Sequence, residues 1–380
     1  MVAVTGGDVR TLRARVPALL LGLVVGLTLL AGNGFVGSAQ AAAPDCDTVS
    51  IEGSGTAADP FRIETLDQLQ CLGETPGTSL GFGDHYELQN DIDAGETATW
   101  NDGAGFDPIA SSDDFFYGTF DGNGFAISNL HIDRPDTERV GLFARLYDLR
   151  IGNVTLESVT ITGGEETGGL LGYNEGGTVS NASVTGTVNG GGETGGLVGA
   201  NTGDVNDSSA TAHVDGSDSA GGLVGYSFDT VRNSSAAGSV NGSEQVGGLV
   251  GFNRGDVYNS SATGDVNGSQ SVGGLLGESQ GTVAGSHASG DVTSSDVFVG
   301  GFVGLSYGDV TESYATGSVT ADGYLGGFVG NNEGDVAESF SAGSVTSGTA
   351  QYIGGFAGTN RDGTIGGPYW DYERSGRLDG

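Results

Sequence analysis

The chain has 380 residues, of which 74 are Gly, and its 48 acidic residues outnumber 13 basic ones, giving a formal net charge of −35. All the basic residues are Arg. The glycines follow no Gly-X-Y period and there are only 7 Pro, which excludes collagen. So large a negative charge argues against nucleic acid or anionic lipid as a partner, because both require a positive surface.

The first 43 residues have the pattern of a secretory signal peptide. Arg10, Arg13 and Arg15 precede an apolar run at 16–30, and small residues follow at 39–43. Cleavage is expected near Ala41 or Ala43. The alternative is an uncleaved membrane anchor, but this run is shorter than the roughly 20 residues that a spanning helix needs. We therefore expect an extracellular or cell-surface protein with no transmembrane anchor after signal removal.

Two cysteines, Cys46 and Cys71, follow the predicted signal peptide. In an oxidising compartment they are expected to form a disulfide, which would contribute about 3 kcal/mol in the chain-entropy model. Two free thiols packed as small hydrophobic groups remain the alternative. A metal site is the weaker interpretation, since only His85 lies near them in the sequence.

An internal repeat organises residues 140–365. Gly-Gly-Leu or Gly-Gly-Phe recurs every 26 to 28 residues, at Leu170, Leu197, Leu223, Leu249, Leu275, Phe302, Phe328 and Phe356. Each unit reads as three strand-length pieces bounded by Gly and Asn. Gly, Val, Ser and Thr dominate where a helical repeat would need helix-forming residues. One such unit cannot bury its own apolar side, so the units are expected to stack as the coils of an all-β solenoid of about nine coils.

Residues at equivalent positions of the repeat predict ladders along the solenoid. A column from Val179 to Val336 that ends with Ile365 is β-branched and should face inward, whereas the column before it alternates mostly between Thr and Asp and should be exposed. A third column holds Asn or Ser, expected at turns with left-handed backbone. Its members are Asn174, Asn201, Ser227, Asn253, Ser279, Ser306, Asn332 and Asn360.

Both ends of the solenoid should be capped, because an open end exposes unpaired strand edges. Residues 44–139 are interpreted as an N-terminal capping segment with a short helix that starts after Thr65 and has Gln68 as the second member of a capping box. Residues 366–380 are interpreted as a C-terminal cap in which Tyr369, Trp370 and Tyr372 cover the last coil. Trp100 and Trp370 are expected in core or cap positions.

The repeated Gly-Gly-Leu-Val-Gly-x-Asn-x-Gly-x-Val, followed by Ser-x-Ala-Thr-Gly-x-Val, resembles the GLUG motif of bacterial and archaeal surface proteins. The resemblance extends over about residues 50–375, including the segments Gly118–Gly124 and Tyr369–Asp371. It implies a right-handed parallel β-helix on an exported protein, as in adhesins and some immunoglobulin-A metallopeptidases. It implies no chemistry by itself.

Several catalytic patterns occur in the chain. Ser279 and Ser306 match the Gly-x-Ser-x-Gly pattern, but both fall in the Asn/Ser column and lack the strand-to-helix context. The metallopeptidase signature His-Glu-x-x-His is absent. The main enzymatic alternative is a polysaccharide-cleaving β-helix that uses Asp265 and Asp291, which are one repeat apart. The sequence thus predicts no enzyme, no catalytic residue, no cofactor and no metal.

Seven N-glycosylation sequons occur, at Asn153, Asn181, Asn206, Asn233, Asn241, Asn259 and Asn267. The acid excess without Lys also suggests a halophilic source, which resemblance to haloarchaeal members supports. The sequence therefore predicts a secreted structural or adhesive scaffold. Its partners would be extracellular glycans or surface proteins. The alternatives are a module that binds a defined carbohydrate or protein, and the extracellular enzyme.

Overall fold

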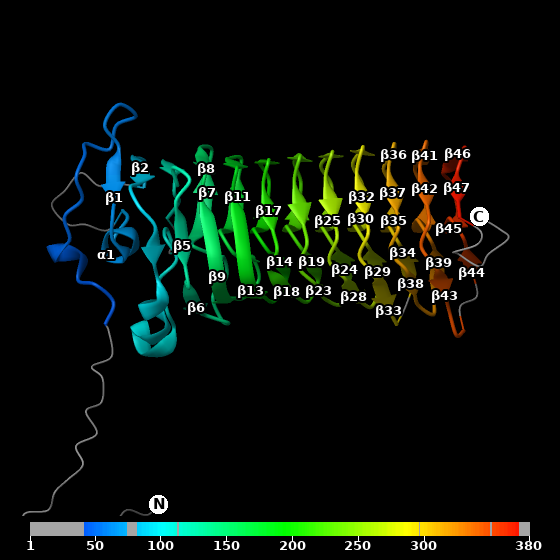
Figure 1. Ribbon diagram of the computed structural model, residues 1–380, viewed down its shortest axis with the longest axis horizontal. Coiled ribbons are helices and arrows are strands. Elements are labelled where there is room, and N and C mark those ends of the chain that lie inside the picture. Colours follow the sequence, from blue (N-terminus) through cyan, green and yellow to red (C-terminus); the bar gives the residue numbers. More distant parts are fainter. Residues whose placement is uncertain (1–41, 74–81, 112–113, 296, 350–351, 372–380) are drawn as a thin grey trace, which may run out of the picture. The chain divides into compact units, whose positions relative to one another are not determined.

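The computed structural model describes residues 42–371 except 74–81, 112–113, 296 and 350–351. The chain divides into two units, Met1–Ala39 and Gln40–Gly380. The predicted signal peptide and Tyr372 lie outside the described residues, apart from Ala42 and Ala43. The second unit is all-β and winds as a parallel solenoid, so the predicted fold class is confirmed. Figure 1 shows equivalent strands of successive coils side by side along this unit.

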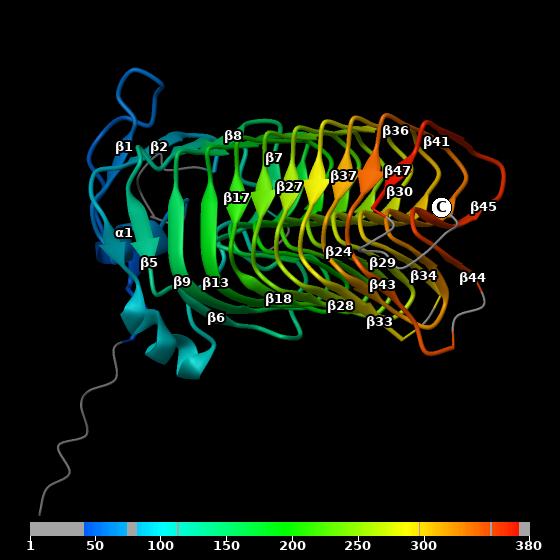
Figure 2. The ribbon, with the colours of Figure 1, turned by 45° about the vertical axis from the view of Figure 1, so that its right-hand side comes forward.

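Each regular coil has five short strands, as in β24 (Gln245–Gly247), β25 (Val250–Asn253), β26 (Val257–Tyr258), β27 (Ser261–Ala262) and β28 (Val266–Gly268). The sequence predicts three pieces per coil. The first piece is divided because the chain bends at Gly248 and Leu249, and the third is divided after Ala262. Stacked coils form four parallel sheets, S1 to S4 (Figure 2).

Sheets S1 and S2 hold the strands on either side of the Gly-Gly step. S1 has eight strands: β10 (Thr167–Gly168), β14 (Glu193–Gly195), β19 (Ser219–Gly221), β24, β29 (Ser271–Gly273), β34 (Phe298–Gly300), β39 (Tyr324–Gly326) and β44 (Tyr352–Gly354). S2 has nine: β7 (Phe143–Tyr147), β11 (Leu171–Glu175), β15 (Val198–Asn201), β20 (Val224–Ser227), β25, β30 (Leu276–Ser279), β35 (Val303–Ser306), β40 (Val329–Asn332) and β45 (Ala357–Asn360).

Sheet S3 is the longest and runs through both the predicted capping segment and the repeats. Its twelve strands are β1 (Phe61–Ile63), β2 (His85–Leu88), β4 (Thr119–Asp121), β8 (Arg150–Gly152), β12 (Thr178–Ser180), β16 (Asp204–Asn206), β21 (Val231–Arg232), β26, β31 (Val283–Ala284), β36 (Val310–Thr311), β41 (Asp335–Ala337) and β46 (Thr364–Gly366).

Sheet S4 has two lanes of strands, and the long strands β9 (Thr155–Thr162) and β13 (Ser183–Asn189) belong to both. Its first lane adds β3 (Ile92–Asp93), β5 (Ala126–Ser128), β17 (Ser209–Ala210), β22 (Ser235–Ala236), β27, β32 (His287–Ala288), β37 (Tyr314–Ala315), β42 (Phe340–Ser341) and β47 (Tyr369–Trp370). Its second lane adds β6 (His131–Asp133), β18 (His213–Asp215), β23 (Val240–Asn241), β28, β33 (Val292–Ser294), β38 (Val319–Thr320) and β43 (Val345–Thr346).

The solenoid has about eleven turns, not the predicted nine. The additional turns come from the segment before residue 140, where β1, β2 and β4 pair in register with one another and with β8. These turns lack the Gly-Gly-Leu signature, and their core positions, Phe61, Tyr86 and Phe120, are unevenly spaced and aromatic. Loops and short helices of different lengths separate their strands, which hides the period in the sequence.

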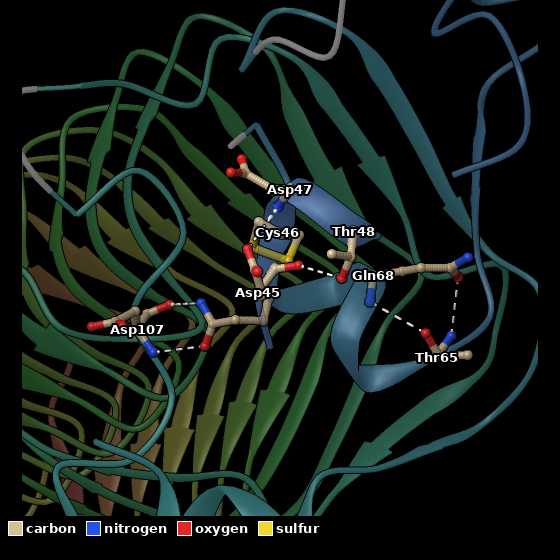
Figure 3. The surroundings of a disulfide bond; sticks show 9 residues. Asp45, Cys46, Asp47, Thr48, Thr65, Gln68 and Asp107 are labelled. Atoms are coloured by element: carbon tan, nitrogen blue, oxygen red, sulfur yellow. Dashed lines mark hydrogen bonds between the residues drawn. A yellow bond between two sulfur atoms is a disulfide. The ribbon is translucent and has the colours of Figure 1, made fainter. Parts of the chain in front are cut away.

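The N-terminal turns are closed by a small cap (Figure 3). It contains η1 (Cys46–Thr48) and α1 (Leu66–Gln70), and Cys46 is bonded to Cys71 with a Cα–Cα distance of 5.3 Å. The capping box at Thr65 and Gln68 is present as predicted. A longer 3₁₀ segment, η2 (Gly95–Gly103), carries the fully buried Trp100. The side chain of Gln70 also holds the backbone N–H and C=O of Asp107 at 2.9 and 3.0 Å.

The C-terminal aromatic residues behave differently from one another. Trp370 is partly buried and packs against the core, in contact with Gly355 of the last coil. Tyr369 instead pairs with Phe340 in S4 and is 66 % exposed. The prediction that Tyr369 covers the last coil is therefore wrong, because alternation along β47 directs its side chain away from the core when that of Trp370 points inward.

The inward-facing columns form a continuous apolar core. The Leu and Phe side chains after each Gly-Gly step and the predicted Val column from Val179 to Val336 are all at most 1 % exposed. In the last three regular coils the column changes to Phe302, Phe328 and Phe356, whose rings stack with centroids 4.6 and 4.8 Å apart. The inward orientation predicted for the β-branched column is confirmed.

The Asn/Ser column forms a hydrogen-bonded ladder inside the solenoid. Asn174 Nδ2 donates to Asn201 Oδ1 at 2.7 Å, and Asn201 Nδ2 donates to Ser227 Oγ at 3.2 Å. The predicted ladder is confirmed, but its left-handed backbone is not, because these residues lie at the ends of S2 strands. In the repeats, positive φ occurs at non-Gly residues of another column, between S3 and S4, which includes Asn181, Asn233 and Asn259.

The paired glycines are required by close contact between coils. A Cβ on Gly247 would lie 2.0 Å from the carbonyl oxygen of Val250, and one on Gly248 would lie 2.1 Å from that of Gly274 in the next coil. Real carbon and oxygen atoms do not approach so closely. The first glycine therefore allows the chain to bend, and the second allows the next coil to stack at β-sheet distance.

We expect Gly248→Ala to lower the free energy of unfolding by at least about 2 kcal/mol, because backbone atoms of the next coil must move to admit the methyl group. The matched control is Gly192→Ala, where the nearest atoms to the added Cβ lie at 3.6 Å. Urea titration followed by circular dichroism would measure both. Equal midpoints for the two variants would contradict this account of the Gly-Gly step.

Candidate functional site

Two small cavities lie over the first turns of S3. One of about 170 Å³ is lined by residues that include His85, Glu87 and Asp121, and its neighbour of about 150 Å³ includes Asp121 and Arg150. Pockets for small molecules usually have about 300–1,000 Å³. These hollows are therefore too small to enclose a typical organic ligand, and the candidate functional surfaces are the outward columns of the repeat.

The acidic side chains of the repeats lie on these outward columns. Among the residues that the structure describes, no Asp or Glu is buried. Several Asp side chains accept a hydrogen bond from the next coil: Asp256 Oδ1 accepts the N–H of Thr282 at 2.9 Å, and Asp335 Oδ1 accepts the hydroxyl of Thr364 at 2.7 Å. The predicted alternation of Thr with Asp thus supplies donors to carboxylates as well as reducing repulsion between them.

Asp265 and Asp291, the pair considered for polysaccharide cleavage, are neighbours in the second lane of S4. The N–H of Asp291 donates to Asp265 Oδ1 at 3.0 Å, and the N–H of Ser318 donates to Asp291 Oδ1 at 2.8 Å. Each carboxylate therefore holds the backbone of the following coil. This structural role explains why the two residues are one repeat apart, and it requires no catalytic function.

The seven sequons fall into three environments. Asn153, Asn181, Asn233 and Asn259 belong to the left-handed column, where each Nδ2 donates to a side-chain oxygen of the preceding coil. Asn206 is half-buried in S3. Asn241 and Asn267 are register partners in S4. Asn267 is exposed. Glycosylation at these positions stays a prediction.

The serines of the two Gly-x-Ser-x-Gly matches are buried in the Asn/Ser ladder. Ser279 Oγ accepts from Asn253 Nδ2 at 3.2 Å, and Ser306 Oγ donates to the carbonyl of Gly308 at 3.0 Å. Neither side chain reaches solvent. Their position in the ladder agrees with the structural interpretation of both matches.

A different group of chemically reactive side chains was missed from the sequence. His213 and Asp215 of β18 lie beside Ser239 and Asn241 of the next coil, because Val214 pairs with Val240 in register. His213 Nδ1 is 2.7 Å from Ser239 Oγ, and His213 Nε2 is 3.1 Å from Asp215 Oδ2. We call these four residues the His213 array. The signal that could have found it is the separation of His213 and Ser239 by one 26-residue period.

Three glutamates have a raised pKa. Partial burial raises the pKa of Glu193, and the nearby carboxylates of Glu165 and Asp218 raise it further. A hydrogen bond from the backbone of Glu193 lowers it, but by less than burial raises it. Burial likewise raises the pKa of Glu166 and Glu278. Asp93 has a lowered pKa because Asn129 and the N–H of Gly95 donate to its carboxylate. Partial desolvation is thus the largest cause of the upward shifts in this acidic protein.

Comparison with known proteins agrees with the repeat pattern. The family model described as the GLUG motif matches residues 163–189, 216–241, 242–267 and 299–320. The chain is 42% identical over 145 residues to halomucin of Haloquadratum walsbyi, covering 37% of this chain and 2% of halomucin. It is 35% identical over 141 residues to a candidate Gly-rich membrane protein of Evansella cellulosilytica, covering 36% of this chain and 16% of that protein. The chain therefore spans only a small part of either relative.

Among solved structures, the chain resembles a candidate immunoglobulin A1 protease from Bacteroides ovatus, with 20% identity and a TM-score of 0.46. The match covers 72% of this chain and 79% of that one. The four matched segments lie in successive or nearby coils of the solenoid. The chain is a protein with GLUG motif repeats, as its sequence predicts.

The raised pKa values predict a pH dependence of stability. The folded chain binds a proton at Glu193 more tightly than the unfolded chain does. The stability from this proton is fully present below the pKa of the unfolded chain and is lost as the pH rises through the folded pKa. We therefore expect Glu193→Gln to raise the melting temperature at pH 7 and to weaken the fall in stability between about pH 4.5 and pH 7.

Glu244→Gln is the matched control, since it removes one acidic charge from an exposed position two coils further along. Melting temperatures measured by circular dichroism across the pH range would compare the variants. If the two curves coincide, desolvation of Glu193 does not contribute to the pH dependence.

Proposed function

We propose that this chain is an exported repeat protein of the cell surface whose solenoid serves as a structural or adhesive scaffold. The observation that carries the proposal is sheet S3, whose twelve strands stack in parallel through both the N-terminal turns and the repeats. Such stacking yields a long object in which each coil contacts mainly its neighbours. The matches to halomucin and to a Gly-rich membrane protein support a surface location.

Export depends on the segment with the pattern of a signal peptide. Within the part of the chain that the structure describes, no helix is long and apolar enough to cross a membrane. We propose that extracellular glycans or surface proteins hold the chain at the surface. The outward columns, with their regular spacing, would offer repeated contacts to such partners, and repeated weak contacts increase binding strength when several engage together.

A binding module for a defined carbohydrate or protein is the second candidate. It is favoured by a row of aromatic side chains on the outside of S4, where His287, Tyr314 and Phe340 stack with ring centroids 4.9 and 5.0 Å apart. Phe340 is 37 % exposed and the neighbouring Tyr369 is 66 % exposed. Exposed aromatic side chains supply contact area at low cost in conformational entropy.

The export proposal predicts that the full chain, expressed with residues 1–43, is recovered outside the cytoplasm and is cleaved by protease added to intact cells. The control is the same chain with Leu23→Arg and Leu27→Arg, which interrupt the apolar run and should keep the protein inside. Recovery of both proteins inside the cell would contradict export. A glycan array with the purified chain then separates an adhesive or ligand-binding role from a purely structural one.

The acid excess on the outside also supports adaptation to concentrated salt. We infer that repulsion between these carboxylates loosens the solenoid when salt is dilute, because screening falls as the Debye length grows. Circular dichroism should therefore show β-structure that is lost as molar salt is diluted to about 10 mM at pH 7. An unchanged spectrum and melting temperature over this range would refute the inference.

A further inference from the structure

The His213 array has the connectivity of a nucleophile, a base and a residue that orients the base. Ser239 Oγ is 2.7 Å from His213 Nδ1, and the other ring nitrogen, Nε2, is 3.1 Å from Asp215 Oδ2. Asp215 is in turn held by Asn241, whose Nδ2 donates to its Oδ1 at 2.6 Å. The array thus contains both hydrogen bonds required of an activated serine.

The hydrogen-bond partners fix the tautomer of His213. A carboxylate only accepts hydrogen bonds, so the ring nitrogen facing Asp215 must carry the proton. In the neutral imidazole, Nδ1 then has a free lone pair and accepts the hydroxyl hydrogen of Ser239. His213 is therefore oriented to remove that proton when Ser239 acts as a nucleophile.

The backbone at this position can also stabilise negative charge. In later coils of the same lane, the N–H of Asp291 and the N–H of Ser318 each donate to a carboxylate oxygen of the preceding coil. The N–H of Ser239 occupies the equivalent position, and within the described chain no acceptor for it is found. The residue in the preceding coil is His213, not an Asp as in the cases of Asp291 and Ser318, so this N–H is available to an oxyanion formed at Ser239.

We propose that Ser239 is an acylatable nucleophile that hydrolyses small activated esters on the outer face of the solenoid. Ser239 Oγ bonds to the ester carbonyl carbon while its proton passes to His213 Nδ1. The carbon–oxygen bond to the leaving alkoxide then breaks, and the alkoxide takes this proton as an alcohol. Water next attacks the acyl-serine and gives one proton to His213, which returns it to Ser239 Oγ as the carboxylic acid leaves.

The substrate class follows from the open position of the array. The side chains of His213 and Asp215 are 38% and 49% exposed, and neither described cavity includes them. Side chains this exposed neither bind a large acyl group nor exclude water, so the substrate must supply a good leaving group itself. Exposure also weakens the electrostatic contribution, which is greatest in a water-excluded site.

The test treats the folded full-length protein with a fluorophosphonate probe and, separately, with p-nitrophenyl acetate. We expect the probe on the peptide that contains Ser239, and ester hydrolysis about 100-fold faster than in Ser239→Ala or His213→Ala, the lower end of general-base catalysis. The controls are Ser318→Ala, a serine in the same lane, and His287→Ala, whose ring stacks on Tyr314. Labelling at many serines alike, or unchanged rates in Ser239→Ala, would overturn the proposal.

Chemical rescue separates catalysis from folding. Added imidazole should restore ester hydrolysis to His213→Ala but not to Ser239→Ala, and a purely structural histidine would show no such difference.

Asp215 is a positioning residue, so Asp215→Asn should lower the rate of ester hydrolysis. It should also move the ring proton of His213 from Nε2 toward Nδ1, which nitrogen NMR would detect. If Asp215→Asn changes neither the tautomer of His213 nor the rate of ester hydrolysis, Asp215 does not position His213. These measurements of ester hydrolysis do not depend on the outcome of the export and scaffold experiments.

Discussion

Close stacking of identical backbone positions is the constraint on which the rest of this structure depends. Parallel coils must approach to about 4.8 Å, and at the Gly-Gly step this places a carbonyl oxygen of the next coil where a Cβ would otherwise be. A side chain at Gly248 would therefore force the backbone of the next coil to move at that point. The large glycine content therefore reflects repeated close contact, and it does not indicate low complexity.

The same stacking decides which residues can occupy the remaining columns. Inside, every position is surrounded above and below by its own equivalents, so an amide at Asn201 is satisfied by Asn174 and Ser227. Outside, the N–H of the residue just before a short strand lies beyond the regular ladder. Asp265 and Asp291 supply the missing acceptor there. Acidic residues thus contribute to the structure as well as to solubility, even though like charges repel along the solenoid.

Structural features that recur at a constant period could be predicted from the sequence, whereas features outside the regular repeats could not. Val257 could be placed in the core because its column holds β-branched residues at a constant period. The hydrogen-bonded ladder through Asn253 followed from the same comparison, although its burial did not. The left-handed column was assigned to Asn253 instead of Asn259, because Asn favours such backbone at both positions and a repeat pattern does not show φ. The turns around Tyr86 and Phe120 were missed because their loops differ in length.

The His213 array was missed for a related reason. The serine nucleophile pattern Gly-x-Ser-x-Gly lies within a continuous segment, and it points to Ser279 and Ser306, which the coils place in the interior. In a solenoid, however, the side chain nearest to a residue is often the one a full period away. His213 and Ser239 occupy one column that continues with Asp265 and Asp291, so the stacking of adjacent coils brings a base beside a hydroxyl. Reactive groups in such proteins are therefore best sought down the columns, where the fold has already fixed the distances between side chains.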